Sequence, residues 1–286
     1  MRRAIPLAVA VLVGATALAG CQDKTSENAR SHVTTAVVSD ETTQDIMVFA
    51  PDAKGSWPVV VALHGIGGTG KDMAEIATRL AREGVVVFAP TYRSDLSTQK
   101  GLVDTVNDVE CGYRFIRSIA AEYGGDLDQP VTFVGWSLGA TAALGIGLTE
   151  NVDPTGKYVS CFSNAPRPDV IVAISGCYFE FEGVQQSYFD VSEWGNKNAG
   201  LTLLAGDDDT TCAAWQSKDA EAQLRSAGYD VDLVMLERAN HYAPIFHDLV
   251  NGEWVVIAND PPGERTVEVI LDAIAANQDQ PSVTAS

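Results

Sequence analysis

The chain has 286 residues, with 38 acidic residues against 19 basic ones and a formal net charge of −19 at pH 7. Such an acidic chain repels phosphate backbones and anionic lipid headgroups, which argues against nucleic acid as a partner and against electrostatic docking to a membrane. No internal linker rich in Pro, Gly or Ser divides the chain, so we expect a single domain over residues 32–286.

The first twenty residues differ from the rest. "MRR" precedes an apolar run from Ala4 to Leu18, too short for a usual membrane span, and "LAGC" ends at Cys21. This pattern predicts an export signal over residues 1–20. "LAGC" resembles the lipobox of bacterial lipoproteins, which implies cleavage before Cys21 and its lipidation; an ordinary secretory signal with a chance cysteine is the alternative. Cleavage would place the protein outside the cytoplasm, anchored to the bacterial cell envelope by lipid alone, with residues 21–31 as a flexible tether.

Strand-like and helix-like segments alternate from residue 33 onward. Apolar runs bounded by turn residues predict strands at 33–38, 43–51, 57–65, 84–90, 130–135, 169–176, 200–206 and 229–236. Helices are expected at about 71–83, 102–123, 138–148, 213–227 and 264–276. The first two strands read as an antiparallel pair, and the later alternation implies an α/β fold, a mostly parallel eight-stranded sheet with helices on both faces. Reactive groups in such sheets gather at the carboxyl ends of the strands.

The stretch "VTFVGWSLGAT", residues 131–141, holds a serine between an apolar strand and a helix of small residues. G-x-S-x-G is a weak signal alone, but this setting is that of a nucleophile elbow, in which Gly135 and Gly139 leave room for a tight crossing. Ser137 would sit at a helix N-terminus, where backbone N–H groups favour developing negative charge. We therefore predict Ser137 to be a nucleophile; a turn serine without chemistry is the alternative.

A serine hydroxyl needs a base, and the chain offers four histidines. His32 lies in the predicted tether or first strand, and His64 opens a glycine-rich loop far upstream. His241 lies in the loop after the last predicted strand, at the same sheet edge as the elbow. We predict His241 to be the base, with His247 as the alternative.

The base in turn needs a carboxylate to orient it. Asp207, Asp208 and Asp209 directly follow the strand that precedes the histidine strand. Three adjacent carboxylates cannot all point inward, so at least two are expected in solvent or capping the next helix. No EF-hand spacing surrounds them, and no metal site is expected.

In this order of nucleophile, acid and histidine, the chain resembles the α/β-hydrolases of the esterase and dienelactone-hydrolase-like group over about residues 33–276. The resemblance implies an α/β-hydrolase fold. The family's G-x-x-D spacing, counted from Gly206, selects Asp209 as the acid. Some members carry the acid one strand earlier, where Glu180 or Glu182 would be the candidate.

The same resemblance assigns the glycine-rich loop "HGIGG", residues 64–68. This segment looks like the family's oxyanion loop, which implies backbone donors at Ile66, at Gly67 as a further candidate, and at Leu138 after the nucleophile. His64 is then a structural loop residue. Ile66 replaces a glycine of the full HGGG form, which weakens the likeness to the lipase branch for bulky substrates.

Four cysteines remain once Cys21 is set aside, and an even number in an exported chain favours two disulfides. None has CxxC spacing, so a thiolate metal site is not expected. Cys111 faces away from the apolar stripe of its helix, and we expect it to bond a covering segment that holds Cys161. Cys177 and Cys212 would then pair beside the site.

The sequence thus predicts a serine hydrolase that cleaves small-molecule or polymeric carboxylic esters through an acyl-enzyme, without a cofactor. The aromatic segment 178–200 is either a short cap over the pocket or a packed surface excursion, and Trp136 is expected in the core or the pocket wall. The alternatives are a binding lipoprotein that kept the fold without the activity, and an acyltransferase or peptidase that uses the same triad.

Overall fold

A computed structural model describes residues 33–39, 44–94, 98–149, 166–181, 184–185, 189–191 and 194–278. The predicted leader and tether lie outside these ranges, as do Cys21, His32, Cys161 and Glu182.

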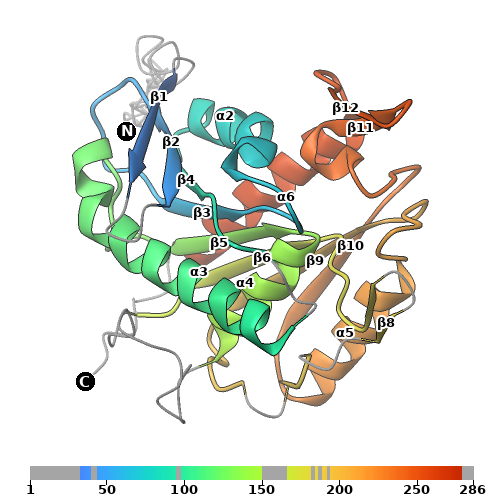
Figure 1. Cartoon of the computed structure of the whole chain (residues 1–286). Coiled ribbons are helices and arrows are strands. Elements are labelled where there is room, and N and C mark those ends of the chain that lie inside the picture. The colour runs from blue at the N-terminus through green and yellow to red at the C-terminus, as the bar shows by residue number, and fades with distance from the viewer. Residues whose placement is uncertain are drawn as a thin grey trace, which may run out of the picture.

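Eight strands form one sheet in the order β1-β2-β4-β3-β5-β6-β9-β10 (Figure 1). Their bounds are β1 Val33–Ser39, β2 Asp45–Pro51, β3 Val59–Leu63, β4 Val86–Pro90, β5 Val131–Trp136, β6 Val170–Ile174, β9 Gly200–Gly206 and β10 Val231–Leu236. β2 pairs antiparallel with both β1 and β4, and the remaining neighbours pair in parallel. This arrangement confirms the predicted, mostly parallel sheet with an antiparallel start.

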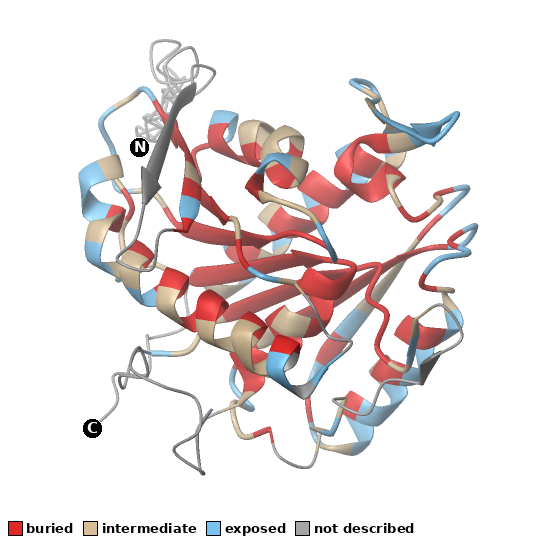
Figure 2. Ribbon diagram, in the orientation of Figure 1, coloured by how far each residue is buried: buried red, intermediate tan, exposed pale blue. Residues whose placement is uncertain are grey.

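Helices cover both faces of the sheet (Figure 1). They are α2 Ala74–Arg82, α3 Gln99–Ile119, α4 Leu138–Leu148, α5 Trp215–Ser226 and α6 Pro261–Asn277, with short 3₁₀ helices η1 Gly70–Met73, η2 Ala120–Tyr123 and η4 Ala243–Ile245. Val59 and Val61 of β3 pack in one core cluster with α3, α4 and α5, whereas Val60 packs in the other with α2 and α6. Because both faces are covered, the central strands are buried throughout (Figure 2), which explains why they read as continuous apolar runs. In the described ranges, no helix has both the length and the apolar character needed to cross a membrane.

Two small hairpins stand outside the main sheet. β7 (Glu180–Phe181) pairs with β8 (Val184–Gln185), and β11 (His247–Val250) pairs with β12 (Glu253–Val256). The sequence predicts no strand in either segment, because a strand of two to four residues is too short to show a recognisable alternation of apolar and polar residues.

The passage from β5 into α4 is a tight crossing of two backbone segments. A Cβ on Gly135 would lie 2.0 Å from the carbonyl oxygen of Gly139, and a Cβ on Gly139 would lie 2.2 Å from that of Leu63. Backbone atoms of a packed helix or strand cannot move aside as a flexible side chain can. Both positions therefore require glycine, as the sequence predicted.

This crossing gives a test with a matched control on one helix. Gly139→Ala is expected to lower the free energy of unfolding by several kcal/mol, on the order of the larger point-mutant effects, because its Cβ meets the β3 backbone. A Cβ on Gly145, also in α4, meets no atom within 4 Å, so Gly145→Ala should be neutral or stabilising by up to about 1 kcal/mol. Urea denaturation of both variants measures the difference, and equal stabilities would contradict the described crossing.

Candidate active site

Ser137 occupies the turn between β5 and α4 with φ 57° and ψ −121°. A positive φ is uncommon for a residue with a side chain and stores strain. The N–H of Ser137 donates to the carbonyl of Ile174 in β6 at 2.9 Å, which helps to hold this conformation. Strained residues fixed in this way are concentrated at functional sites.

His241 lies between Ser137 and Asp209. Its Nε2 is 3.0 Å from Ser137 Oγ, and its Nδ1 is 2.8 Å from Asp209 Oδ2. The other carboxylate oxygen of Asp209 accepts the N–H groups of Thr211 and Cys212, both at 2.9 Å. Ser137, His241 and Asp209 are each at most 4% exposed. A carboxylate fixed on both oxygens assigns the ring proton to Nδ1 and leaves Nε2 free to accept from the serine hydroxyl.

The other candidate acids and bases lie elsewhere. Asp207 and Asp208 are exposed, so of the three adjacent carboxylates only Asp209 turns inward. Glu180 is also exposed, in β7. His247 is buried, with its Nδ1 2.7 Å from the carbonyl of Ile245.

A disulfide joins Cys177 to Cys212, as predicted. Cys177 follows β6, and Cys212 supplies one of the two N–H groups that bind Asp209 Oδ1. The bond therefore ties the loop of the acid to the end of a neighbouring strand. Cys111 is disulfide-bonded as well, but Cys161, its predicted partner, lies outside the described residues.

The glycine-rich loop after β3 packs against the elbow. A Cβ on Gly65 would lie 3.2 Å from Ser137 Cβ. The N–H of Gly67 donates to Ser94 Oγ at 2.7 Å, whereas the N–H groups of Ile66 and Leu138 bind no acceptor among the described residues. Of the backbone donors that the resemblance implied, the N–H of Gly67 is therefore already engaged, whereas the N–H groups of Ile66 and Leu138 have no acceptor among the described residues.

His64 is a buried residue of this loop. Its Nδ1 lies 2.7 Å from the carbonyl of Gly65 and so must donate, while its Nε2 accepts the N–H of Tyr92 at 3.2 Å. Its ring stacks on Tyr92 with centroids 4.1 Å apart. Burial lowers the pKa of His64 below its usual value, which favours the neutral ring that these two hydrogen bonds require. His64 has no free nitrogen with which to act as a base.

Two side chains hold the His241 loop in ways that the sequence did not reveal. Trp136 Nε1 donates to the carbonyl of His241 at 2.8 Å. Asn240 Oδ1 accepts the N–H groups of Tyr242 and Ala243, and its Nδ2 donates to Asp248 Oδ1 at 3.0 Å. An asparagine directly before the predicted base is a signal for such a side-chain-to-backbone turn, and it was the only clue that the sequence offered.

A cleft of about 530 Å³ opens over Ser137 and His241. Its described lining comprises Ile66, Gly67, Gly68, Thr69, Asp72, Trp136, Ser137, Phe181, Thr211, His241, Tyr242, Leu249 and Trp254. Phe181 is the described residue of segment 178–200 that lines it, whereas Tyr178 and Trp194 are buried in the core under α4 and α5. The described part of that segment is therefore mostly packed surface, with one side chain at the cleft.

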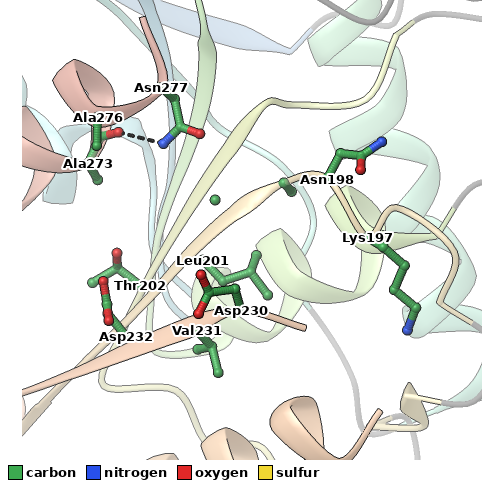
Figure 3. A pocket seen from close by; sticks show the side chains of 12 residues that line it. Lys197, Asn198, Leu201, Thr202, Asp230, Val231, Asp232, Ala273, Ala276 and Asn277 are labelled. Carbon is green, nitrogen blue, oxygen red and sulfur yellow. Dashed lines mark hydrogen bonds between the residues drawn. The ribbon is translucent and has the colours of Figure 1, made fainter. Parts of the chain in front are cut away.

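A second hollow of about 420 Å³ lies at the opposite edge of the sheet, where β9 and β10 begin (Figure 3). Its polar lining includes Asp230, Asp232 and Asn277, whose Nδ2 donates to the carbonyl of Ala273 at 2.8 Å. Its described lining has no serine or histidine, and ligands of parallel sheets bind at the carboxyl ends of strands. The cleft over Ser137 is therefore the candidate active site.

Solved structures with the same architecture are numerous. A Klebsiella pneumoniae protein assigned as a dienelactone hydrolase is 17% identical, with a TM-score of 0.61, and the match covers 85% of this chain and 99% of that one. A truncated carbohydrate esterase from gut microbiota is 16% identical, with a TM-score of 0.65 and coverage of 86% and 98%. A thermophilic esterase from Thermogutta terrifontis with bound propionate is 16% identical, with a TM-score of 0.61 and coverage of 89% and 97%. These likenesses establish the α/β-hydrolase fold.

No curated protein sequence matches the chain. The BD-FAE family model, by contrast, matches residues 45–193, which include β2 to β8 and Ser137. Because this match spans more than half of the 286 residues, the chain belongs to the BD-FAE family.

Proposed function

We propose that the protein hydrolyses carboxylic esters with Ser137 as nucleophile, His241 as general base and acid, and Asp209 as the residue that orients the histidine. The observation that carries this proposal is the continuous hydrogen-bonded chain from Asp209 through His241 to Ser137 at the floor of a cleft. The family match supports it, as do structural neighbours described as esterases, one of them with bound propionate, a carboxylic acid.

In the proposed reaction, Ser137 Oγ attacks the ester carbonyl carbon while its proton passes to His241 Nε2. The carboxylate of Asp209 stabilises the imidazolium that forms. The negative charge on the former carbonyl oxygen is bound by the N–H groups of Ile66 and Leu138, the latter at the N-terminus of α4, where the helix dipole adds to the effect. Collapse of this intermediate breaks the bond to the alcohol oxygen, which takes the proton from His241. Water then attacks the acyl-enzyme by the same route.

Ser137→Ala tests the nucleophile. The variant is expected to lose at least about 10⁴-fold in kcat on p-nitrophenyl esters, because among the described residues no other hydroxyl is hydrogen-bonded to His241 Nε2. Labelling by a fluorophosphonate should disappear with it, while the unfolding transition stays intact. Esters from acetate to palmitate give the acyl preference at the same time.

The wild type decides between the proposed function and its alternatives in the same assay. If it neither turns over any of these esters nor reacts with the fluorophosphonate, the protein is a binding lipoprotein with a hydrolase fold. Transfer of the acyl group to an added alcohol or amine in preference to water, measured as the new ester or amide against free acid, would instead identify an acyltransferase. Cleavage of peptides in preference to esters would identify a peptidase.

The acid can be tested against its own neighbour. Asp209→Asn should lower kcat about 10⁴-fold, because the amide cannot hold the Nδ1–H tautomer of His241 or stabilise the imidazolium. Asp208→Asn, one residue away and exposed, should keep wild-type kcat. Both are measured with p-nitrophenyl acetate, and equal losses in the two variants would remove Asp209 from the triad.

We also propose that the chain is exported and lipid-anchored at Cys21, outside the cytoplasm. The leader sequence supports this, as does the Cys177–Cys212 disulfide, since such bonds persist in oxidising compartments. Expressed in a bacterium, the wild type should fractionate with membranes and Cys21→Ser should not. Identical fractionation of the two proteins would rule out lipidation at this cysteine.

A further inference from the structure

The β11–β12 hairpin leaves large apolar side chains in solvent beside the candidate active site. It projects from the body of the molecule after the His241 loop (Figure 1) and is mostly exposed (Figure 2). Leu249 is 44% exposed, Val250 45%, Trp254 38% and Val256 51%. Apolar side chains gathered in solvent at the rim of a cleft mark a surface that binds a ligand.

The two faces of the hairpin differ. Leu249 pairs with Trp254 and His247 with Val256, so these four side chains share one face, whereas Val250 pairs with Glu253 on the other. Leu249 and Trp254 line the cleft, and Val250 does not. We call Leu249, Trp254 and Val256 the apolar strip.

The apolar strip is continuous with the catalytic histidine. The ring of Trp254 lies 5.2 Å from that of Tyr242 and 5.6 Å from that of Trp136, and the ring of Tyr242 lies 5.2 Å from that of His241. These are contact distances for aromatic side chains. A wall of aromatic side chains therefore leads from His241 through Tyr242 to Trp254 on the hairpin.

The proposed reaction indicates which part of the ester lies against this wall. When the tetrahedral intermediate collapses, the bond between the carbonyl carbon and the alcohol oxygen breaks, and that oxygen takes the proton from His241 Nε2. The alcohol must therefore leave on the side of Ser137 where His241 lies. Resting on the proposed function, we infer that the apolar strip binds the alcohol moiety of the ester, and that this moiety is an apolar aryl or alkyl group.

The small number of hydrogen-bonding groups on this face supports an apolar alcohol. Leu249 and Val256 offer no hydrogen bond, Trp254 offers only its indole N–H, and His247 is buried with its Nδ1 bound to the carbonyl of Ile245. A hydroxyl-rich alcohol seated here would lose hydrogen bonds to water and regain few of them. An apolar ring or chain instead removes its own surface and that of Trp254 from water.

Two ester series test the assignment. The first enlarges the alcohol, with ethyl and 2-naphthyl acetate, and the second enlarges the acyl group, with ethyl acetate and ethyl hexanoate. In Trp254→Ala the ratio of kcat/KM for 2-naphthyl acetate over ethyl acetate should fall about tenfold, while the ratio for ethyl hexanoate over ethyl acetate stays within about twofold of wild type. Trp254→Phe, which keeps a flat ring, should restore most of the alcohol preference.

Val250 provides the matched control, because it is as exposed as Leu249 on the opposite face. Leu249→Ala should lower the alcohol ratio, and Val250→Ala should leave both ratios unchanged. Leu249→Ala also covers the case in which Trp254→Ala fails to fold. The inference is overturned if the strip variants change only the acyl ratio, change neither ratio, or behave like Val250→Ala.

Direct binding of the free alcohol separates this inference from the proposed function. 2-Naphthol is not hydrolysed, and its Kd, followed by its fluorescence, should rise about tenfold in Trp254→Ala and not in Val250→Ala. Such a result in a wild type that cleaves no ester would sink the proposed function and leave the strip as a binding site for apolar alcohols. If, conversely, the wild type cleaves esters while Trp254→Ala changes neither the alcohol ratio nor the Kd for 2-naphthol, the inference about the apolar strip is overturned. That result would leave the proposed function standing.

Discussion

The passage of the chain from β5 into α4 is the constraint on which the site depends. A residue held at φ 57° costs on the order of 1–3 kcal/mol, so the surroundings must hold it there. The N–H of Ser137 is fixed by β6, and α4 is buried along most of its length against β3, β5 and β6. The small residues of α4 allow this close approach, because larger ones would collide with the sheet. The apolar core thus holds the serine in its strained conformation.

The other two members of the hydrogen-bonded chain reach Ser137 because of the strand order. β5, β6, β9 and β10 are consecutive neighbours and run in parallel, so the loops after them meet at one edge. Ser137 follows β5, Asp209 follows β9 and His241 follows β10. The Cys177–Cys212 disulfide joins the loop after β6 to the loop after β9. Asp209 is therefore tied to the strand that separates it from Ser137, which limits how far these two residues can move apart.

The sequence predicts those features that depend on burial or on local spacing. The central strands can be recognised in the sequence as continuous apolar runs, because both of their faces are covered. Asp209 can be selected by its spacing of three residues from Gly206. Contacts between segments that are distant in the sequence produce no comparable local pattern. The engagement of the Gly67 N–H by Ser94 joins residues 27 positions apart, and Trp136 reaches the carbonyl of His241 across 105 positions. Nothing in either local sequence distinguishes these donors from free ones.

The β11–β12 hairpin escaped prediction for a further reason. Its strands are four residues long, and apolar side chains lie on both of its faces, so it shows neither the continuous run of a buried strand nor clean alternation. A prediction that assigns every apolar residue to the core therefore misplaces the exposed apolar residues of this hairpin.

The contrast between the hairpin and the hydrogen-bonded chain has a physical basis. Ser137, His241 and Asp209 are almost fully buried, and in such surroundings of low dielectric constant the hydrogen bonds between them are stronger than in water. The apolar strip, by contrast, is still partly in water, with Leu249 44%, Trp254 38% and Val256 51% exposed, so it can bury further apolar surface when a ligand arrives. Burial would weaken the strip as a binding surface, and exposure would weaken the hydrogen-bonded chain. A projecting hairpin attached directly to the histidine loop lets one short stretch of chain meet both requirements.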